Sequence, residues 1–195
     1  MAQDTKTILI QSKQDITHAN EVRRFSMMIF DEVCEKLYSM PDRHRQYLEA
    51  ASLLHDIGYS IEANNHNKHS MHIIIENGIE GFNSRECQII GCICRYHRGS
   101  LPKKQEHEVY KDLEKQERKT VKRLGGILKL SDGLGRGRIN FIKKVNIKYD
   151  TENNIVEFLL TPATPNFYPD ISAAARKRDL FEIGFKCQSV LKFCK

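Results

Sequence analysis

Apolar residues recur at steps of three and four over most of the chain, which predicts a mainly α-helical protein. The first periodic run follows Asp15 and indicates a long helix to about residue 37. Its apolar face comprises His18, Val22, Phe25, Ile29, Val33 and Leu37. Met40-Pro41-Asp42 ends this run, and a second helix is expected over residues 43–54. Residues 1–14 are polar and are expected to form a loose lead-in.

The middle of the chain predicts two more helices. A polar loop at residues 64–67 precedes a short helix over 68–77, which Gly78 ends. Asn83 and Glu86 then stand at capping-box spacing and open the next helix, although a capping box prefers Ser or Thr at its first position.

The alternating charges of residues 103–119 indicate a solvated connection or the surface of a helix. A further helix then carries Val121, Leu128 and Asp132 on one face and ends at Gly133-Leu134-Gly135.

After residue 142 the period changes from helical to alternating. Val145, Ile147 and Tyr149 alternate with polar residues, as do Val156, Phe158 and Leu160, and residues 150–154 between them resemble a turn. This pattern predicts a β-hairpin. A final helix is expected from about Ser172, with Leu180, Phe181 and Phe185 on its apolar face. The predicted organisation is therefore a lead-in (1–14), a helical domain (15–142) and a hairpin plus C-terminal helix packed on it (143–195).

Composition places the chain among ordinary globular proteins, with 40% hydrophobic and 29% charged residues. A net charge of +6 suits an anionic small molecule, but it is too small and too dispersed to indicate nucleic acid. The six cysteines form no Cys-x-x-Cys pair, which favours reduced core residues and a cytoplasmic setting. Neither a signal peptide nor a membrane-spanning run is recognisable. The hairpin is interpreted as packing or dimerisation structure, so a homodimer is one arrangement to test.

The candidate chemistry starts at His55-Asp56, where the second predicted helix ends before Gly58. Imidazole and carboxylate are both metal ligands, but neighbours on a helix point about 100° apart, so one ion cannot easily be held by both. A left-handed turn at Gly58 would relieve that constraint. Taken alone, the pair is better explained by capping of the helix end than by metal binding.

His18 and Asp132 change this interpretation, because both lie on helix faces that should be buried. A buried aspartate is costly unless it has a counter-charge or a metal. Two histidines and two carboxylates form a nitrogen and oxygen set that suits Mn, Mg, Fe, Co or Ni. Such a set leaves coordination positions open for water and a phosphoryl oxygen, as metal-assisted hydrolysis requires.

The order of these ligands resembles the HD superfamily of metal-dependent phosphohydrolases, and further motifs resemble the HD-type C-terminal region of the exopolyphosphatase/guanosine pentaphosphatase (Ppx/GppA) family. These motifs are Leu53-Leu54-His55-Asp56-Ile57-Gly58, His66-Asn67-Lys68-His69-Ser70, Arg95-Tyr96-His97-Arg98, Leu130-Ser131-Asp132-Gly133-Leu134 and Ala173-Ala174-Ala175-Arg176-Lys177. The likeness spans roughly residues 15–185 and implies an HD-domain helical bundle. Its metal ligands would be His18, His55, Asp56 and Asp132.

The resemblance also implies that a second ion would be held by additional histidines, with Asp56 bridging both ions. His69 and His97 match these positions best, and His66 and His72 match them less well. Hydrogen-bonded core histidines are the competing interpretation. One ion and two ions both remain open.

The family's polyphosphate site lies in an N-terminal actin-like ATPase-fold part that these 195 residues do not contain, so exopolyphosphatase activity by that route is not expected. Because all four ligands are present, a free-standing HD hydrolase is favoured, with His55 and Asp56 as its catalytic pair. Lys68, Arg95, Arg98 and Arg136 are candidate phosphate contacts, since arginine forks match phosphate oxygens, although surface arginines also form weak solvated pairs.

The sequence thus predicts a metal-dependent phosphohydrolase that acts on a phosphorylated small molecule such as a nucleotide, an alarmone or polyphosphate, through a metal-activated water. The alternative is a non-catalytic, metal-stabilised HD module that binds a phosphorylated ligand or a partner protein. Nucleic-acid binding has only the modest positive charge in its favour.

Overall fold

The computed structural model describes residues 2–12, 15–136 and 141–194, and it is mostly helical with a small sheet. Its first six helices are α1 (Thr5–Gln11), α2 (Ile16–Lys36), α3 (Asp42–Leu54), the 3₁₀ turn η1 (Ile57–Ser60), α4 (His66–Asn77) and α5 (Ser84–Arg95). They are followed by α6 (Glu108–Asp112), α7 (Lys115–Gly135), β1 (Ile142–Asp150), β2 (Ile155–Pro162), α8 (Ser172–Ala175), α9 (Asp179–Phe185) and β3 (Gln188–Phe193). The described residues are thus mainly helical, as expected, and their sheet has three strands rather than the two of the predicted hairpin.

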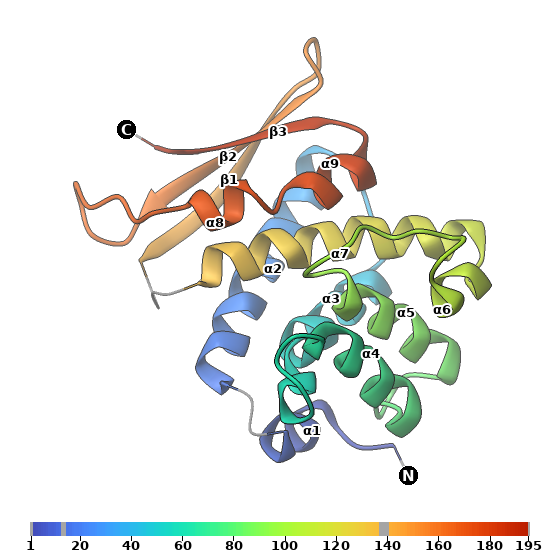
Figure 1. Cartoon of the computed structure of the whole chain (residues 1–195). Coiled ribbons are helices and arrows are strands. Elements are labelled where there is room, and N and C mark those ends of the chain that lie inside the picture. Colours follow the sequence, from blue (N-terminus) through green and yellow to red (C-terminus); the bar gives the residue numbers. More distant parts are fainter. Residues whose placement is uncertain (1, 13–14, 137–140, 195) are drawn as a thin grey trace.

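The two long helices, α2 and α7, cross at the middle of the molecule, with the sheet on one side and α3 to α6 on the other (Figure 1). Helix α2 begins where Asp15 caps it by accepting hydrogen bonds from the backbone N–H groups of Thr17 and His18. The predicted apolar face is confirmed, because Val22 and Phe25 are fully buried against the neighbouring elements. The Asn83–Glu86 capping box is also formed, at the start of α5.

Glycines allow two close approaches between elements that shape the site. A Cβ atom on Gly58 would overlap the carbonyl oxygen of His66 and lie 2.6 Å from the Ser70 nitrogen. The backbone of Gly58 is not in the left-handed region, so the prediction of a left-handed turn at this residue is wrong. Gly58 instead makes room for α4 to rest against η1. On α7, a Cβ on Gly133 would lie 2.5 Å from the Ala174 Cα, so α8 packs directly on the helix backbone.

The β-hairpin is confirmed, with β1 and β2 antiparallel and Val145 opposite Leu160. The C-terminal region differs from the prediction of one helix, because α8 and α9 are separate short helices and β3 follows them, parallel to β2. Parallel strands are joined by a long connection, so the strand with which residues 188–193 pair is distant in sequence. The local pattern of these six residues therefore does not reveal their pairing with β2.

The N-terminal segment is more ordered than the expected lead-in. Helix α1 buries Ile8 and Leu9 and packs against α3, while residues 13 and 14 lie outside the described part of the chain.

The division into domains at residue 142 stays a prediction. All six cysteines are free. Among the described residues, no helix combines the length and apolar character needed to cross a membrane.

Candidate metal centre

Six side chains from distant parts of the chain converge between α2, α4 and α7, and we call them the His/Asp cluster: His18, His55, Asp56, His66, His97 and Asp132. Helices α2 and α7 supply one each, the end of α3 supplies two, and the start of α4 and the end of α5 supply the other two. His55, His66, His97 and Asp132 are almost completely buried.

Asp56 is the centre of this cluster, and its two oxygens face different imidazoles. Oδ2 lies 3.3 Å from Nε2 of His55 and 3.8 Å from Nε2 of His18. Oδ1 lies 3.3 Å from Nε2 of His66 and 3.4 Å from Nε2 of His97. Two sets of three potential ligand atoms therefore share Asp56, and within each set the atoms lie within 4.8 Å of one another.

The other ring nitrogen of three histidines is engaged with the backbone. Nδ1 lies 2.9 Å from the Ser52 carbonyl oxygen in His55, 2.7 Å from that of Ala63 in His66 and 2.6 Å from that of Cys94 in His97. A carbonyl oxygen only accepts, so Nδ1 carries the proton and the Nε2 lone pair points into the cluster. Backbone contacts of this kind orient metal-binding histidines.

The Nε2 atom of His55 is buried and forms no hydrogen bond to the described residues, although Oδ2 of Asp56 lies 3.3 Å away. Burial alone would lower the pKa of His55, but the Asp56 carboxylate outweighs burial and raises it. Burial lowers the pKa values of His66 and His97, which favours their neutral, ligand-competent forms. A bound cation would provide the partner that this buried nitrogen lacks.

The carboxylates are held ionised. Burial would raise the pKa of Asp56, but His55 and His97 keep it well below its usual range. Burial likewise opposes ionisation of Asp132, whose pKa is lowered mainly by its hydrogen bond to His18. The Asp132 Oδ1 atom lies 3.3 Å from His18 Nε2, but Asp132 is not part of the compact set formed by His18, His55 and Asp56.

Lys177 is a neighbour of the cluster that the sequence did not single out. Its Nζ forms an ion pair with Oδ2 of Asp132, and it follows α8, which the missing Cβ of Gly133 brings onto α7. The only sequence signal was its place in the motif Ala173-Ala174-Ala175-Arg176-Lys177. Burial lowers the pKa of Lys177. The pair leaves Oδ1 as the Asp132 oxygen that faces His18.

A cleft of about 540 Å³ opens onto the cluster, and Tyr59, Arg98 and Arg136 are among its lining residues. Tyr59 stacks on the His66 ring at a centroid distance of 4.0 Å, and Arg98 lies 3.4 Å from the Tyr59 hydroxyl. The Arg136 guanidinium is 3.8 Å from Asp132 Oδ2. Two of the four predicted phosphate contacts thus lie beside the cluster.

The remaining predicted residues lie elsewhere. His69 pairs with Glu62, its Nε2 3.3 Å from Oε2, and it does not join the cluster. Arg95 and His72 line a different pocket between α4, α5 and α6. Lys68 is exposed and is absent from the lining of the cleft. His66, the weaker candidate by sequence, occupies the position expected of His69.

A comparison with protein families supplies independent evidence of relationship. The model described as Ppx/GppA phosphatase, domain III, matches residues 4–166, which is most of the chain. No curated protein matches the chain.

Proposed function

This chain belongs to the Ppx/GppA phosphatase family, and we propose that it is an HD-type, metal-dependent phosphohydrolase acting on a phosphorylated small molecule at the His/Asp cluster. The observation that carries the proposal is the environment of Asp56. Each of its oxygens faces two imidazole nitrogens, and three of the four histidines have their other nitrogen on a backbone carbonyl.

The cluster divides into two ligand sets. His18, His55, Asp56 and Asp132 would hold one divalent cation, and Asp56, His66 and His97 would hold a second, with Asp56 shared. The donor set contains nitrogen and oxygen but no thiolate, which suits Mn, Fe, Co, Ni or Mg. Two carboxylates would leave a net positive charge on two divalent ions, and an anionic substrate would complete the balance.

A bound cation supplies a water of lowered pKa and polarises a phosphoryl group. The chain's own groups then position and neutralise the substrate. Arg98 and Arg136 line the cleft and offer guanidinium forks to phosphoryl oxygens. Lys177 holds one oxygen of Asp132, so that the other stays directed at His18.

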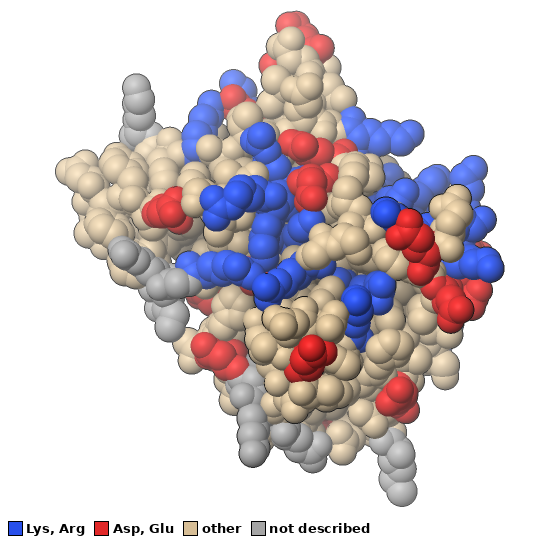
Figure 2. Space-filling view, in the orientation of Figure 1, with Lys and Arg blue, Asp and Glu red and all other residues tan. Residues whose placement is uncertain are grey.

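Basic side chains also surround the site more widely. Figure 2 shows Lys and Arg gathered across the middle of one face, where Figure 1 places α7, α8 and α9. Together with the net charge of +6, this surface favours the approach of anionic ligands.

His66 and His69 offer a matched test, because they lie one turn apart on α4 and only His66 faces Asp56. With Mn at about 100 times its Kd, the wild-type protein should gain about 2.7 kcal/mol of stability, or roughly 5–10 °C in Tm. We expect His66→Ala to reduce this shift and to lower phosphate release from a panel of phosphorylated compounds. His69→Ala should retain both.

Equal losses in the two variants would contradict the ligand assignment. Asp56→Ala should abolish the Mn-dependent shift and the turnover together. Turnover that survives in Asp56→Ala would overturn the proposed mechanism, because both ligand sets depend on that carboxylate.

A second function is favoured by one observation, namely that the family match is to a domain III model. In that case the metal-loaded domain would bind a phosphorylated ligand or a partner protein without hydrolysing anything. A protein that shows the Mn-dependent Tm shift and binds a nucleotide, yet releases no phosphate from the panel, would select this alternative.

A further inference from the structure

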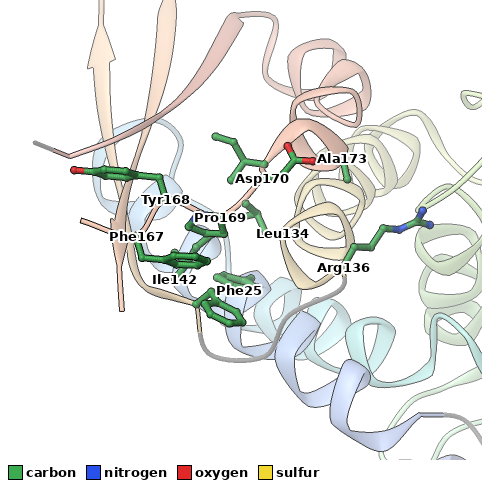
Figure 3. Close-up of a pocket in the computed structure, with 11 residues that line it drawn as sticks. Phe25, Leu134, Arg136, Ile142, Phe167, Tyr168, Pro169, Asp170 and Ala173 are labelled. Atoms are coloured by element: carbon green, nitrogen blue, oxygen red, sulfur yellow. The ribbon is translucent and has the colours of Figure 1, made fainter. Parts of the chain in front are cut away.

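A second hollow adjoins the cleft, and we propose that it binds the base of a nucleotide whose phosphates reach the His/Asp cluster. The hollow has a volume of about 390 Å³, and its lining includes Phe25, Leu134, Arg136, Phe141, Phe167 and Tyr168 (Figure 3). This inference rests on the proposed function for the phosphate end of the ligand, and it assigns the substrate class.

The wall of this hollow is aromatic and partly open to solvent. Phe141 and Phe167 form a tilted pair with ring centroids 5.3 Å apart, and Tyr168 packs against Phe193. Phe167 and Tyr168 are nevertheless 37% and 54% exposed. Large aromatic rings left exposed beside a pocket provide faces on which a flat ring can stack, and base–aromatic stacking contributes about 1–3 kcal/mol.

The same two helices carry both sites. On α2, Phe25 lines the hollow and follows His18 by seven residues, which is about 10 Å along the helix axis. On α7, Leu134 lines the hollow and lies next but one to Asp132. The hollow and the cluster therefore lie next to each other on the same two helices, so a ligand that filled both would need two different ends.

Arg136 connects the two sites, because it lines both the hollow and the cleft. Figure 3 shows its guanidinium pointing away from the aromatic rings, and the same group lies 3.8 Å from Asp132 Oδ2. A ligand that filled both sites would place its apolar ring against the aromatic wall and pass its charged part along Arg136.

A nucleotide has this construction, with a planar base, a sugar spacer and a phosphate chain. Inorganic polyphosphate is charged along its whole length and has no flat apolar ring to stack on the aromatic wall. Nucleotide binding should therefore depend on the aromatic wall and polyphosphate binding should not, which makes the assignment testable.

The experiment compares AMP, GMP and inorganic tripolyphosphate by equilibrium dialysis, with the full chain and with Phe167→Ala and Tyr168→Ala. Both residues are exposed, so the variants should fold. We expect nucleotide affinity to fall roughly 10- to 100-fold, with tripolyphosphate binding unchanged. Tyr38→Ala is the matched control, because Tyr38 is 41% exposed and lines neither site.

The proposal would be overturned if both variants bound nucleotides as tightly as the wild type. It would also be overturned if they lost affinity for tripolyphosphate as much as for nucleotides. Loss of a dimer in Tyr168→Ala, measured by sedimentation, would assign the hollow to a second copy instead and would also overturn it. Dialysis with AMP in metal-free protein separates this inference from the proposed function. Binding there that depends on Phe167 supports the hollow even if Mn-dependent hydrolysis is absent.

Discussion

Replacing Gly58 by alanine should disturb the fold and the metal centre together. Its Cβ would lie 2.6 Å from the Ser70 nitrogen and 2.8 Å from the His66 carbonyl carbon, where ordinary contacts are 3.4–4 Å. Those atoms belong to the backbone of α4, so relief requires the helix to move by about 1 Å. His66 would move with it, and its Nε2 now lies only 3.3 Å from Asp56 Oδ1.

The energetic cost follows from this overlap. Overpacking a closed site costs about 1–3 kcal/mol and occasionally more, while the Gly→Ala change recovers about 0.4–1 kcal/mol by restricting the unfolded chain. The Gly58 N–H also donates to Ser70 Oγ at 2.9 Å, and that hydroxyl donates to the His55 carbonyl, so the shift would strain two further hydrogen bonds. We expect a net loss of about 2 kcal/mol, or roughly 4–8 °C in Tm.

Urea unfolding monitored by circular dichroism, with and without Mn, would measure both effects. Gly125→Ala is the control, because its Cβ would meet mainly the flexible end of Leu180 at 3.2 Å, and its stability should change by less than about 1 kcal/mol. If Gly58→Ala unfolds at the wild-type urea midpoint and keeps the wild-type Mn response, then the close packing of η1 on α4 does not position His66.

Two further predictions concern charges. The Arg43 guanidinium lowers the pKa of Glu86 from 4.5 to about 2. The ionised Glu86 therefore stabilises the folded state above pH 4.5, and this stabilisation is lost as the pH falls towards 2. After discounting for solvent screening, Glu86→Gln should therefore lower the free energy of unfolding by about 1 kcal/mol near neutral pH. As the pH falls from 4.5 towards 2, the urea midpoint of the variant should change less than that of the wild type. Equal pH dependence of the two midpoints would contradict this prediction. Lys177→Gln removes the group that holds Oδ2 of Asp132 and should weaken Mn binding roughly 10-fold by calorimetry, whereas unchanged or tighter binding would mean that Lys177 does not position Asp132.

Periodicity located the long helices because burial of one face repeats with the turn of the helix. It placed His18 and Asp132 on inward faces of α2 and α7, and both lie at the cluster. The hairpin was likewise predictable, since its strands are adjacent in sequence and alternate in polarity. Helical periodicity and strand alternation are local properties, so they can be recognised within one helix or one hairpin without knowledge of the rest of the fold.

The choice between His66 and His69 could not be made in this way. The two residues are separated by one turn and about 60° around α4, and each begins a plausible apolar stripe. The buried stripe is His66, Ser70 and Ile74, because Ser70 docks on η1 below Gly58. A clue was present in the small residue at position 70, which permits close packing, but its partner was not visible in the pattern.

Residue types and their spacing established a helical protein with histidines and aspartates on inward-facing positions. Docking decided which of them meet, because Gly58 and Gly133 let α4 and α8 approach to backbone contact and so deliver His66 and Lys177. The aromatic hollow arises in the same way, since α2, α7 and the segment after β2 are far apart in the chain and each contributes part of its wall. Contacts between distant segments depend on the relative placement of whole elements, which no local pattern encodes.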